Sequence, residues 1–190
     1  RTRYVSHRPR DGGVEVVVAT PDGRRSVRCR YLVGADGGDS SVRRAIDPAF
    51  GASRRFWYVQ HYHEGAATLE PDVYYFVIGR SFSDQQAGFC RSDDLICYGT
   101  SFVDRRTRDN YLQRLADLMA KRFDVRLGAR VRSEACRFSI DPAHWRFNYG
   151  GGRVLIAGEA AGLLAAFGEG IPSALVSGVA AGRSIHTALS

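Results

Sequence analysis

Apolar runs and turn residues alternate along the first fifty residues. Residues 14–19 are apolar and β-branched, and Pro21, Asp22 and Gly23 separate them from an alternating stretch at residues 26–30. This pattern predicts a β-hairpin. A second apolar run at residues 31–33 ends in a glycine and predicts a short buried strand. Ser40 or Ser41 then predicts the cap of a short helix that Pro48 stops.

The middle of the chain has a different pattern. Aromatic-rich, strand-like segments occur at residues 56–63, 73–78, 86–90 and 95–102, with turn residues between them. This spacing predicts an antiparallel sheet. Residues 108–123 place their apolar side chains on one face and predict an amphipathic helix.

The last forty residues again combine strand and helix patterns. Residues 153–158 predict a buried strand that runs into a glycine, after a turn at residues 148–152. A small-residue stretch and a glycine-rich loop follow. A helix is predicted from Ile171 or Pro172 to residue 188, because proline is favoured at the first helical position.

Two strand-to-glycine junctions carry the candidate chemistry. Residues 32–37 read Leu-Val-Gly-Ala-Asp-Gly, and residues 155–162 read Leu-Ile-Ala-Gly-Glu-Ala-Ala-Gly. Each places a carboxylate, Asp36 or Glu159, just past the carboxyl end of a buried strand, where open α/β sheets bind ligands. Such a carboxylate can accept hydrogen bonds from ribose or ribityl hydroxyls. N–H groups at a helix start suit phosphate or a partly negative ring oxygen. Either junction alone is equally typical of an ordinary turn.

The two motifs in this order resemble the FAD-dependent monooxygenase and geranylgeranyl reductase superfamily. Residues 32–44 are similar to its "DG" motif and residues 154–162 to its "GD" motif, with Glu159 in place of the usual Asp. The resemblance implies an α+β or α/β chain: a partial FAD-binding domain of the glutathione-reductase-like Rossmann type with an inserted antiparallel β-sheet substrate domain. The FAD-binding segments are expected at residues 1–50 and 149–190, and the substrate domain at residues 51–148.

The resemblance also assigns roles to single residues. It implies that Asp36 lies near FAD and the path of NAD(P)H, that Glu159 binds the ribityl chain, and that the loop of residues 168–171 presents N–H groups to the flavin. It implies that Arg43 positions the FAD-binding segment, whereas the sequence itself favours solvent or a sheet edge for this arginine and Arg44. The expected cofactor-binding residues are Asp36, Gly37, Arg43, Gly158, Glu159, Ala160, Gly162, Gly168, Gly170 and Ile171. No catalytic proton donor is predicted.

Details of the second motif favour one branch of the superfamily. Ala160-Ala161-Gly162 and the loop Gly168-Glu169-Gly170-Ile171 are similar to geranylgeranyl reductases rather than to aromatic hydroxylases. The resemblance implies an FAD-dependent oxidoreductase that takes hydride from NAD(P)H and reduces a C=C bond of a small apolar substrate. A prenyl group is one candidate, although residues 88–94 lack the Tyr-x-Trp-x-Phe-Pro stretch of that branch. Two alternatives stay open: a flavin-dependent monooxygenase, and a non-catalytic remnant unable to hold FAD.

One part of an FAD site is missing from the sequence. FAD-binding Rossmann units hold the pyrophosphate with Gly-x-Gly-x-x-Gly at the start of a helix after a strand. The sequence contains no such glycine motif between a predicted strand and a predicted helix. The superfamily carries this fingerprint well before the DG motif. We therefore expect the 190 residues to be the central part of a larger flavoenzyme whose N-terminal Rossmann segment lies outside them.

Charge and hydropathy narrow the classes of partner. The net charge is +7, but the arginines are scattered in pairs rather than clustered among aromatic residues. Nucleic-acid binding is therefore not expected, and the arginines indicate either compositional bias or attraction to an anionic cofactor or membrane surface. No signal-peptide pattern or spanning segment occurs. We expect a cytoplasmic location, with peripheral membrane association as an alternative.

Histidines and cysteines offer weaker candidates. His61 and His63 share a strand face and are expected on the sheet surface or lining a cavity, with a metal site as the minority interpretation and no metal predicted. Of the cysteines, Cys90 and Cys97 fall in the predicted sheet. Without Cys-x-x-Cys spacing they are expected to pack as small apolar residues, with a redox role as the alternative.

Overall fold

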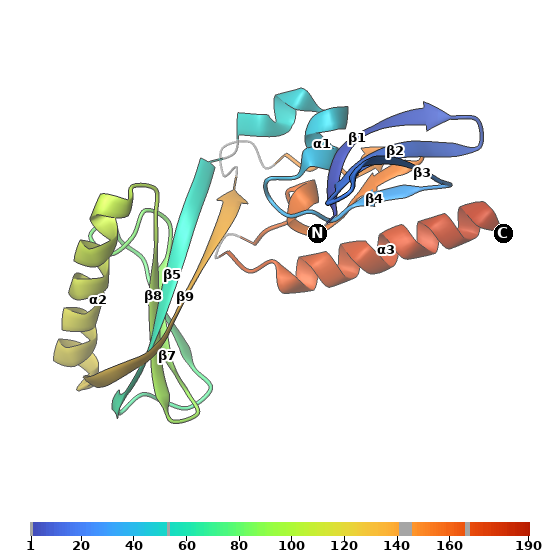
Figure 1. Ribbon diagram of the computed structural model, residues 1–190. Coiled ribbons are helices and arrows are strands. Elements are labelled where there is room, and N and C mark those ends of the chain that lie inside the picture. Colours follow the sequence, from blue (N-terminus) through green and yellow to red (C-terminus); the bar gives the residue numbers. More distant parts are fainter. Residues whose placement is uncertain (1, 53, 141–145, 166–167) are drawn as a thin grey trace. The chain divides into compact units, whose positions relative to one another are not determined.

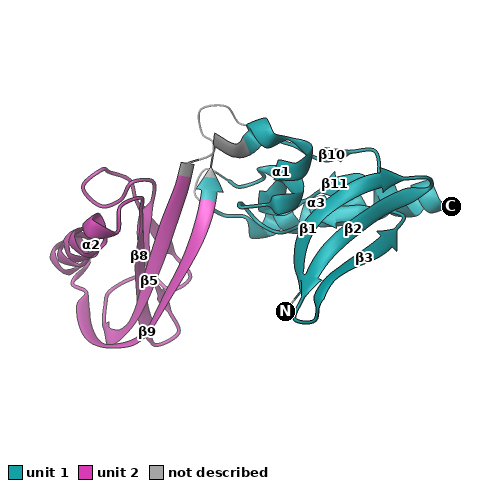
Figure 2. Cartoon of the chain, turned by 45° about the horizontal axis from the view of Figure 1, so that its top comes forward, with its two compact units in different colours: residues 1–54, 139–190 teal, residues 55–138 magenta. Residues whose placement is uncertain are grey.

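The computed structural model describes residues 2–52, 54–140, 146–165 and 168–190. The chain divides into two compact units (Figures 1 and 2). Unit 1 combines residues 1–54 with residues 139–190, and unit 2 comprises residues 55–138. The mixed α+β architecture with antiparallel sheets agrees with the expected fold class.

Unit 1 begins with an antiparallel sheet of β1 (Arg3–Arg10), β2 (Gly13–Thr20) and β3 (Gly23–Cys29). The predicted hairpin is β2 and β3, which pair from Val14 opposite Cys29 to Thr20 opposite Gly23. Val14 and Val16 are buried on one face of β2. The polar strand β1, which pairs with β2, was not predicted.

A second sheet in unit 1 joins segments that lie far apart in the sequence. Its order is β10 (Gly150–Gly151), β11 (Val154–Ile156) and β4 (Leu32–Gly34). Strands β11 and β4 are parallel, with Ile156 opposite Gly34. Around them lie α1 (Ser41–Ile46), the 3-10 helices η1 (Pro48–Ala52) and η3 (Gly158–Ala161), and α3 (Ile171–Leu189). A core shared by β2, α1, β11 and η3 contains Val14, Val16, Val42, Val154, Ile156, Ala160 and Ala161.

Unit 2 is a sheet in the order β6 (Tyr74–Val77), β7 (Ala87–Ser92), β8 (Leu95–Phe102), β5 (Arg54–Ala66) and β9 (Arg126–Ile140). After the short 3-10 helix η2 (Arg105–Thr107), α2 (Arg108–Phe123) covers one face of the sheet (Figure 1). Leu115 and Met119 of α2 are fully buried against Phe89 and Ile96 of the sheet. The predicted helix and strands are present, and β9 is an addition to them.

No described helix is long and apolar enough to cross a membrane.

Candidate functional site

The two glycine-containing motifs meet at one edge of the parallel sheet. Because β4 and β11 run in the same direction, the loops that follow them leave from the same end. The backbone N–H of Ala157 donates to the carbonyl of Gly34 over 3.0 Å, which continues the pairing into the loops. Asp36 and Glu159 are thus brought to one region from positions far apart in the sequence.

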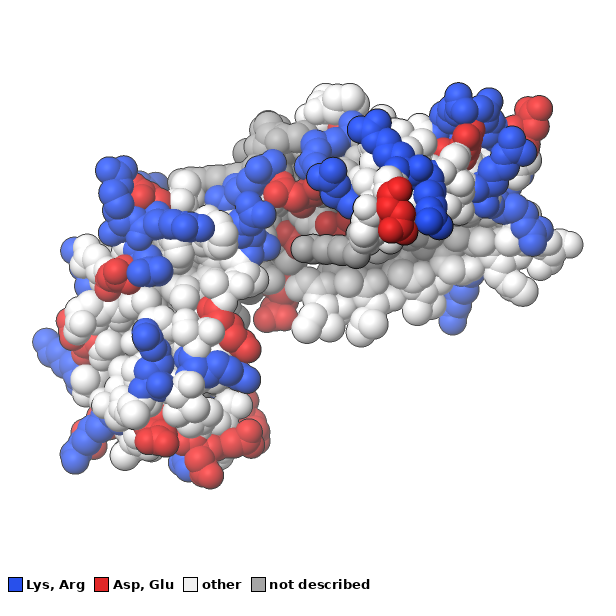
Figure 3. Space-filling view, viewed as in Figure 1, with Lys and Arg blue, Asp and Glu red and all other residues white. Residues whose placement is uncertain are grey.

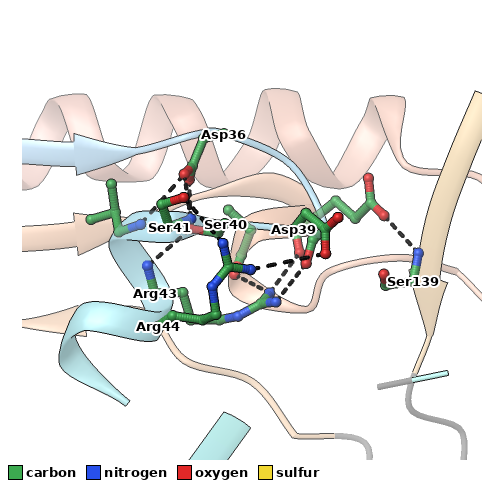
Figure 4. Close-up of polar contacts among 11 residues, drawn as sticks. Asp36, Asp39, Ser40, Ser41, Arg43, Arg44 and Ser139 are labelled. Atoms are coloured by element: carbon green, nitrogen blue, oxygen red, sulfur yellow. Dashed lines mark hydrogen bonds and ion pairs between the residues drawn. The ribbon is translucent and has the colours of Figure 1, made fainter. Parts of the chain in front are cut away.

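Asp36 is held by the start of α1. Its Oδ1 accepts a 2.5 Å hydrogen bond from the Ser40 hydroxyl, and its Oδ2 accepts one of 2.7 Å from the backbone N–H of Ser41. Ser40 is the N-cap of the helix, and its hydroxyl oxygen accepts from the N–H of Arg43. A carboxylate is favoured at this end of a helix because the first N–H groups have no partners within it. Asp36 therefore fixes the conformation of its own loop (Figure 4).

Arg43 lies inside the site rather than in solvent or at a sheet edge, so that expectation was wrong for this residue. Only 3% of the surface of Arg43 is exposed to solvent. Nη1 donates to the carbonyl of Ala160 over 2.6 Å, and Nη2 donates to that of Gly38 over 2.6 Å. Its guanidinium also lies over the Phe50 ring, 4.5 Å from the centroid. The short helix turns this position toward η3, where one planar cation can bond to both motif loops.

Acidic residues surround the Arg43 guanidinium. The pKa of Arg43 lies below its ordinary value, mainly because the side chain is buried and also because Arg44 is adjacent. The negative charges of Asp36 and Glu159 offset part of this lowering. Arg44 itself points outward and lies 3.9 Å from an oxygen of Asp39, as an exposed ion pair. The two adjacent arginines therefore have different environments (Figure 4).

Glu159 lies against the first motif. Its Oε1 accepts a 2.9 Å hydrogen bond from the backbone N–H of Ser139. A Cβ atom on Gly38 would overlap this same oxygen, so the first loop needs glycine at position 38 to leave room for the carboxylate. Gly37 is the second glycine beside Glu159, and its φ of +76° favours glycine.

The remaining residues of the second motif connect β11 to α3. Gly158, with φ +63°, donates its N–H to the Ser177 hydroxyl of α3 over 2.8 Å. Ala160 is fully buried beneath the loop, and Gly162 ends η3 in a left-handed conformation. The second motif is therefore anchored to α3 by a side chain that sequence reasoning did not single out.

The expected flavin-facing loop forms the start of α3. The N–H of Gly168 donates to the Ala165 carbonyl over 2.9 Å. Gly170 is the N-cap of α3, and Ile171, its first residue, is 71% exposed. The first turn of a helix directs its N–H groups outward, where they favour negative charge.

Beside the motifs, α3 presents an apolar surface. Leu175, Val176 and Val179 are more than half exposed. A groove of about 670 Å³ runs between α3 and the second sheet, with Leu155, Ile156, Val176 and Ala180 among its lining residues. On the face drawn in Figure 3, α3 is nearly uncharged, whereas basic and acidic side chains intermingle elsewhere.

Two residues that contact the motifs were missed by the sequence analysis. The backbone N–H of Ser139 and the hydroxyl of Ser177 each bond to the second motif. Ser139 makes its contact through the backbone N–H, which nearly every residue has, so the residue type gives no sign of it. Ser177 lies within the predicted last helix, among small residues such as Ala174 and Gly178, and this composition was the available signal.

His61 and His63 lie on β5 in unit 2. His61 and His63 flank Tyr98, with ring centroids 5.7 and 5.6 Å from it. Among the described residues, no group of three or more potential ligands is placed to hold a metal ion.

The residues present fit part of an FAD site. A carboxylate, a glycine-lined approach and the start of a long helix converge at the carboxyl ends of parallel strands. This donor set suits hydroxyl groups and a partly negative ring edge, which are the features of a ribityl chain and an isoalloxazine. Phosphate binding of the Gly-x-Gly-x-x-Gly kind has no counterpart in the sequence.

Two curated relatives share 30% identity with this chain. One is the 12-dehydrotetracycline 5-monooxygenase/anhydrotetracycline 6-monooxygenase of Streptomyces rimosus, matched over 181 residues that cover 84% of this chain and 34% of the relative. The other is protein CbrA of Escherichia coli O139:H28, matched over 167 residues that cover 85% of this chain and 45% of the relative. The chain therefore spans less than half the length of these relatives.

Solved structures support the fold. A geranylgeranyl bacteriochlorophyll reductase-like protein from Thermoplasma acidophilum superimposes with a TM-score of 0.75 at 17% identity, covering 96% of this chain and 47% of that one. The OxyS anhydrotetracycline hydroxylase of Streptomyces rimosus superimposes with a TM-score of 0.52 at 24% identity, covering 90% and 34%.

The family assignment comes from a model described as "FAD binding domain", which matches residues 1–175. That span includes both motifs, the inserted sheet and the start of α3. With the fold and the site described above, it shows that this chain belongs to the FAD binding domain family.

Proposed function

We propose that this chain holds the flavin and ribityl part of FAD in a larger oxidoreductase. The observation that carries the proposal is the convergence of Glu159, the neighbouring glycines Gly37 and Gly38, and the start of α3. Bound FAD would supply hydride transfer between an electron donor and the substrate.

Each part of the site has a separate task in this proposal. The Glu159 carboxylate accepts hydrogen bonds from ribityl hydroxyls, and its length is accommodated by glycine at position 38. The first N–H groups of α3 favour negative charge at the N1–O2 edge of the ring. Arg43 touches neither and instead holds the two loops at a fixed separation through their carbonyls.

The pyrophosphate grip is proposed to come from a segment outside this sequence. Within the described sheet order, β4 is an edge strand, and Val33 on it is 39% exposed. An unpaired strand edge accepts a further strand, and the apolar face of α3 accepts a packed element. We propose that an N-terminal strand and helix carrying Gly-x-Gly-x-x-Gly pair with β4 and cover α3. The relatives, which are more than twice as long as the matched region, have room for such a segment.

For the reaction, we propose reduction of a C=C bond in a small apolar substrate, with NAD(P)H as the electron donor. The loop Gly168-Glu169-Gly170-Ile171 and the sequence Ala160-Ala161-Gly162 support this branch. A second candidate is monooxygenation, which the 30% identical tetracycline monooxygenase favours. No residue of the chain is assigned as a proton donor.

A binding titration tests the cofactor role. In the full-length protein, Glu159→Ala should weaken FAD binding at least about tenfold, which corresponds to about 1.4 kcal/mol and to the loss of hydrogen bonds to a charged acceptor. The matched control is Glu70→Ala, an exposed carboxylate in unit 2. Equal FAD affinity of both variants and wild type, measured by quenching of flavin fluorescence, would contradict the role of Glu159.

Oxygen dependence separates the two reactions. FAD in the protein is reduced with NADPH under anaerobic conditions, and apolar alkenes are then added. Reoxidation of the flavin by an alkene without oxygen supports the reductase. Substrate-stimulated NADPH oxidation that requires oxygen supports the monooxygenase and contradicts the reductase.

A further inference from the structure

Two cysteines of unit 2 face each other across neighbouring strands. Cys90 of β7 is directly opposite Cys97 of β8 in their antiparallel pairing. The Cα atoms of directly opposed residues lie roughly 4.5–5.5 Å apart, which falls within the roughly 4.4–6.8 Å range of disulfide-bonded cysteines. Both are free thiols in this structure, and each thiol shifts the pKa of the other. Opposed residues of an antiparallel pair project from the same face of the sheet, so the two sulfur atoms can meet across the neighbouring strands.

The two thiols differ in access and acidity. Cys90 is partly exposed, whereas Cys97 is 2% exposed. Interaction with the neighbouring Cys97 thiol lowers the pKa of Cys90 to about 7, and the same interaction together with burial raises the pKa of Cys97. Since the thiolate is the reactive form of cysteine, Cys90 is the accessible nucleophile and Cys97 the thiol behind it.

A series of hydrogen-bonded polar side chains holds the Cys97 side chain in place. The Gln60 amide nitrogen donates to Cys97 Sγ and also to the Tyr62 hydroxyl, the latter over 3.0 Å. Tyr62, directly opposite Cys97 on β5, donates to a carboxylate oxygen of Glu134 over 2.9 Å. An amide donor beside a buried sulfur stabilises negative charge as that sulfur becomes a nucleophile. Simple packing of a small apolar residue would not require such a donor.

We propose that Cys90 and Cys97 form a redox site that hydroperoxides oxidise to a disulfide. The Cys90 thiolate attacks a peroxide oxygen, so that an S–O bond forms, the O–O bond breaks, and hydroxide takes up a proton and leaves as water. The Cys97 sulfur then attacks the sulfenic sulfur of Cys90. The S–S bond forms, the S–O bond breaks, and the departing hydroxide leaves with the Cys97 proton as a second water. The dithiol loses two electrons, hydrogen peroxide gains them, and a dithiol reductant reverses the reaction.

The expected rate advantage is modest. At pH 7 a thiol with a pKa near 7 is about half ionised, against about 3% for an ordinary thiol. Because nucleophilicity falls with pKa, roughly a threefold advantage in rate remains over an unperturbed thiol of equal access. The distinguishing property of this site is therefore the identity of the product, a Cys90 to Cys97 disulfide, more than its speed.

Peptide mapping of the purified full-length protein tests the proposal without any variant. Arg91 lies between the two cysteines, so trypsin separates them unless a disulfide joins the peptides. After treatment with an equivalent of hydrogen peroxide and alkylation, the linked peptides should appear and should disappear on reduction. Recovery of both cysteines as alkylated thiols, or linkage of Cys97 to Cys136 instead, would overturn it.

Variants then assign the order of attack. In Cys97→Ser, a sulfenic acid at Cys90 should accumulate and react with dimedone, whereas Cys90→Ser should form neither sulfenic acid nor disulfide. Cys29→Ser, in unit 1, is the matched control and should behave as wild type. Dimedone labelling at Cys97 in Cys90→Ser would overturn the assignment of Cys90 as the nucleophile. The readouts need no FAD, so failure here is distinguishable from failure of the proposed function.

Discussion

The guanidinium of Arg43 donates a 2.6 Å hydrogen bond to the carbonyl of Ala160, across more than a hundred residues of sequence. A second 2.6 Å bond runs from the same group to Gly38. One side chain therefore ties together the two motif loops between which the ribityl chain is proposed to lie. The separation of these loops depends on a planar cation with several donors in fixed directions.

Replacing Arg43 should therefore be costly. Arg43→Ala leaves at least two inward-facing carbonyls without their donor, at about 1–3 kcal/mol each, and the free energy of unfolding should fall by roughly 2–5 kcal/mol. Arg43→Lys should restore only part of this, since an ammonium cannot bridge both carbonyls with the same geometry. The control Arg44→Ala removes an exposed charge and should change stability by less than about 0.5 kcal/mol. Urea denaturation measures all three, and equal effects of the two alanine variants would contradict the bridge.

Gly38→Ala should weaken FAD binding and spare the fold. The added Cβ meets the Glu159 carboxylate, which has to rotate away from its position beside Ser139. The matched control is Gly151→Ala, where an added Cβ meets nothing within 4 Å. Flavin fluorescence titration in the full-length protein gives the affinity, and circular dichroism checks the fold. If Gly38→Ala binds FAD as tightly as the control, the carboxylate is not part of the cofactor contact.

Acid should weaken the N-terminal sheet through Glu15. Hydrogen bonds from Arg8, and then from Ser26 and Arg10, hold the pKa of Glu15 far below its usual range. A lowered folded-state pKa means that the stabilisation is present above the ordinary glutamate pKa of about 4.3 and is lost as the pH falls below it.

The stability difference between wild type and Glu15→Gln should therefore be largest near neutral pH and shrink toward pH 3. Added salt should shrink it as well, because the group is close to solvent. Asp11→Asn, an exposed change in the turn before β2, is the control. Urea midpoints across the pH range provide the measurement, and a difference that does not depend on pH would contradict the prediction.

A substitution on the exposed face of α3 should have opposite effects on stability in the 190-residue chain and in a longer form of the protein. Gly178 lies on the same helical face as Ile171 and Leu175, and an added Cβ there meets nothing within 4 Å. In the 190-residue chain, Gly178→Ala should stabilise by about 0.5–1 kcal/mol, the helical cost of glycine. If a further segment covers α3 in the longer protein, the same change should destabilise that form. Thermal unfolding of both forms decides, and stabilisation in both would contradict the covering segment.

Much of the fold could be predicted because local signals were strong. The amphipathic stripe of α2, the turn between β2 and β3, and Ser40 as the cap of α1 are all set by near neighbours in sequence. The meeting of the two motifs was implied by the resemblance, which assigns both to one cofactor. Either junction alone was equally typical of an ordinary turn.

Other features depend on contacts between distant residues. β9 is a long, charge-rich edge strand, and most of its residues are exposed, so its sequence lacks the apolar pattern that marks a strand. β1 is similarly polar. The burial of Arg43 could not be predicted from an arginine pair, because its partners are backbone carbonyls, one of them in a remote loop.

The parallel pairing of β4 with β11 also constrains the order of events during synthesis. Leu32 leaves the ribosome long before its partner Val154. Unit 2, in contrast, is one continuous segment of the chain. Domains generally fold as units while the chain emerges. Unit 2 can therefore complete its sheet while β4 still lacks its partner β11. β11 emerges later, and its pairing with β4 then brings the two motifs together.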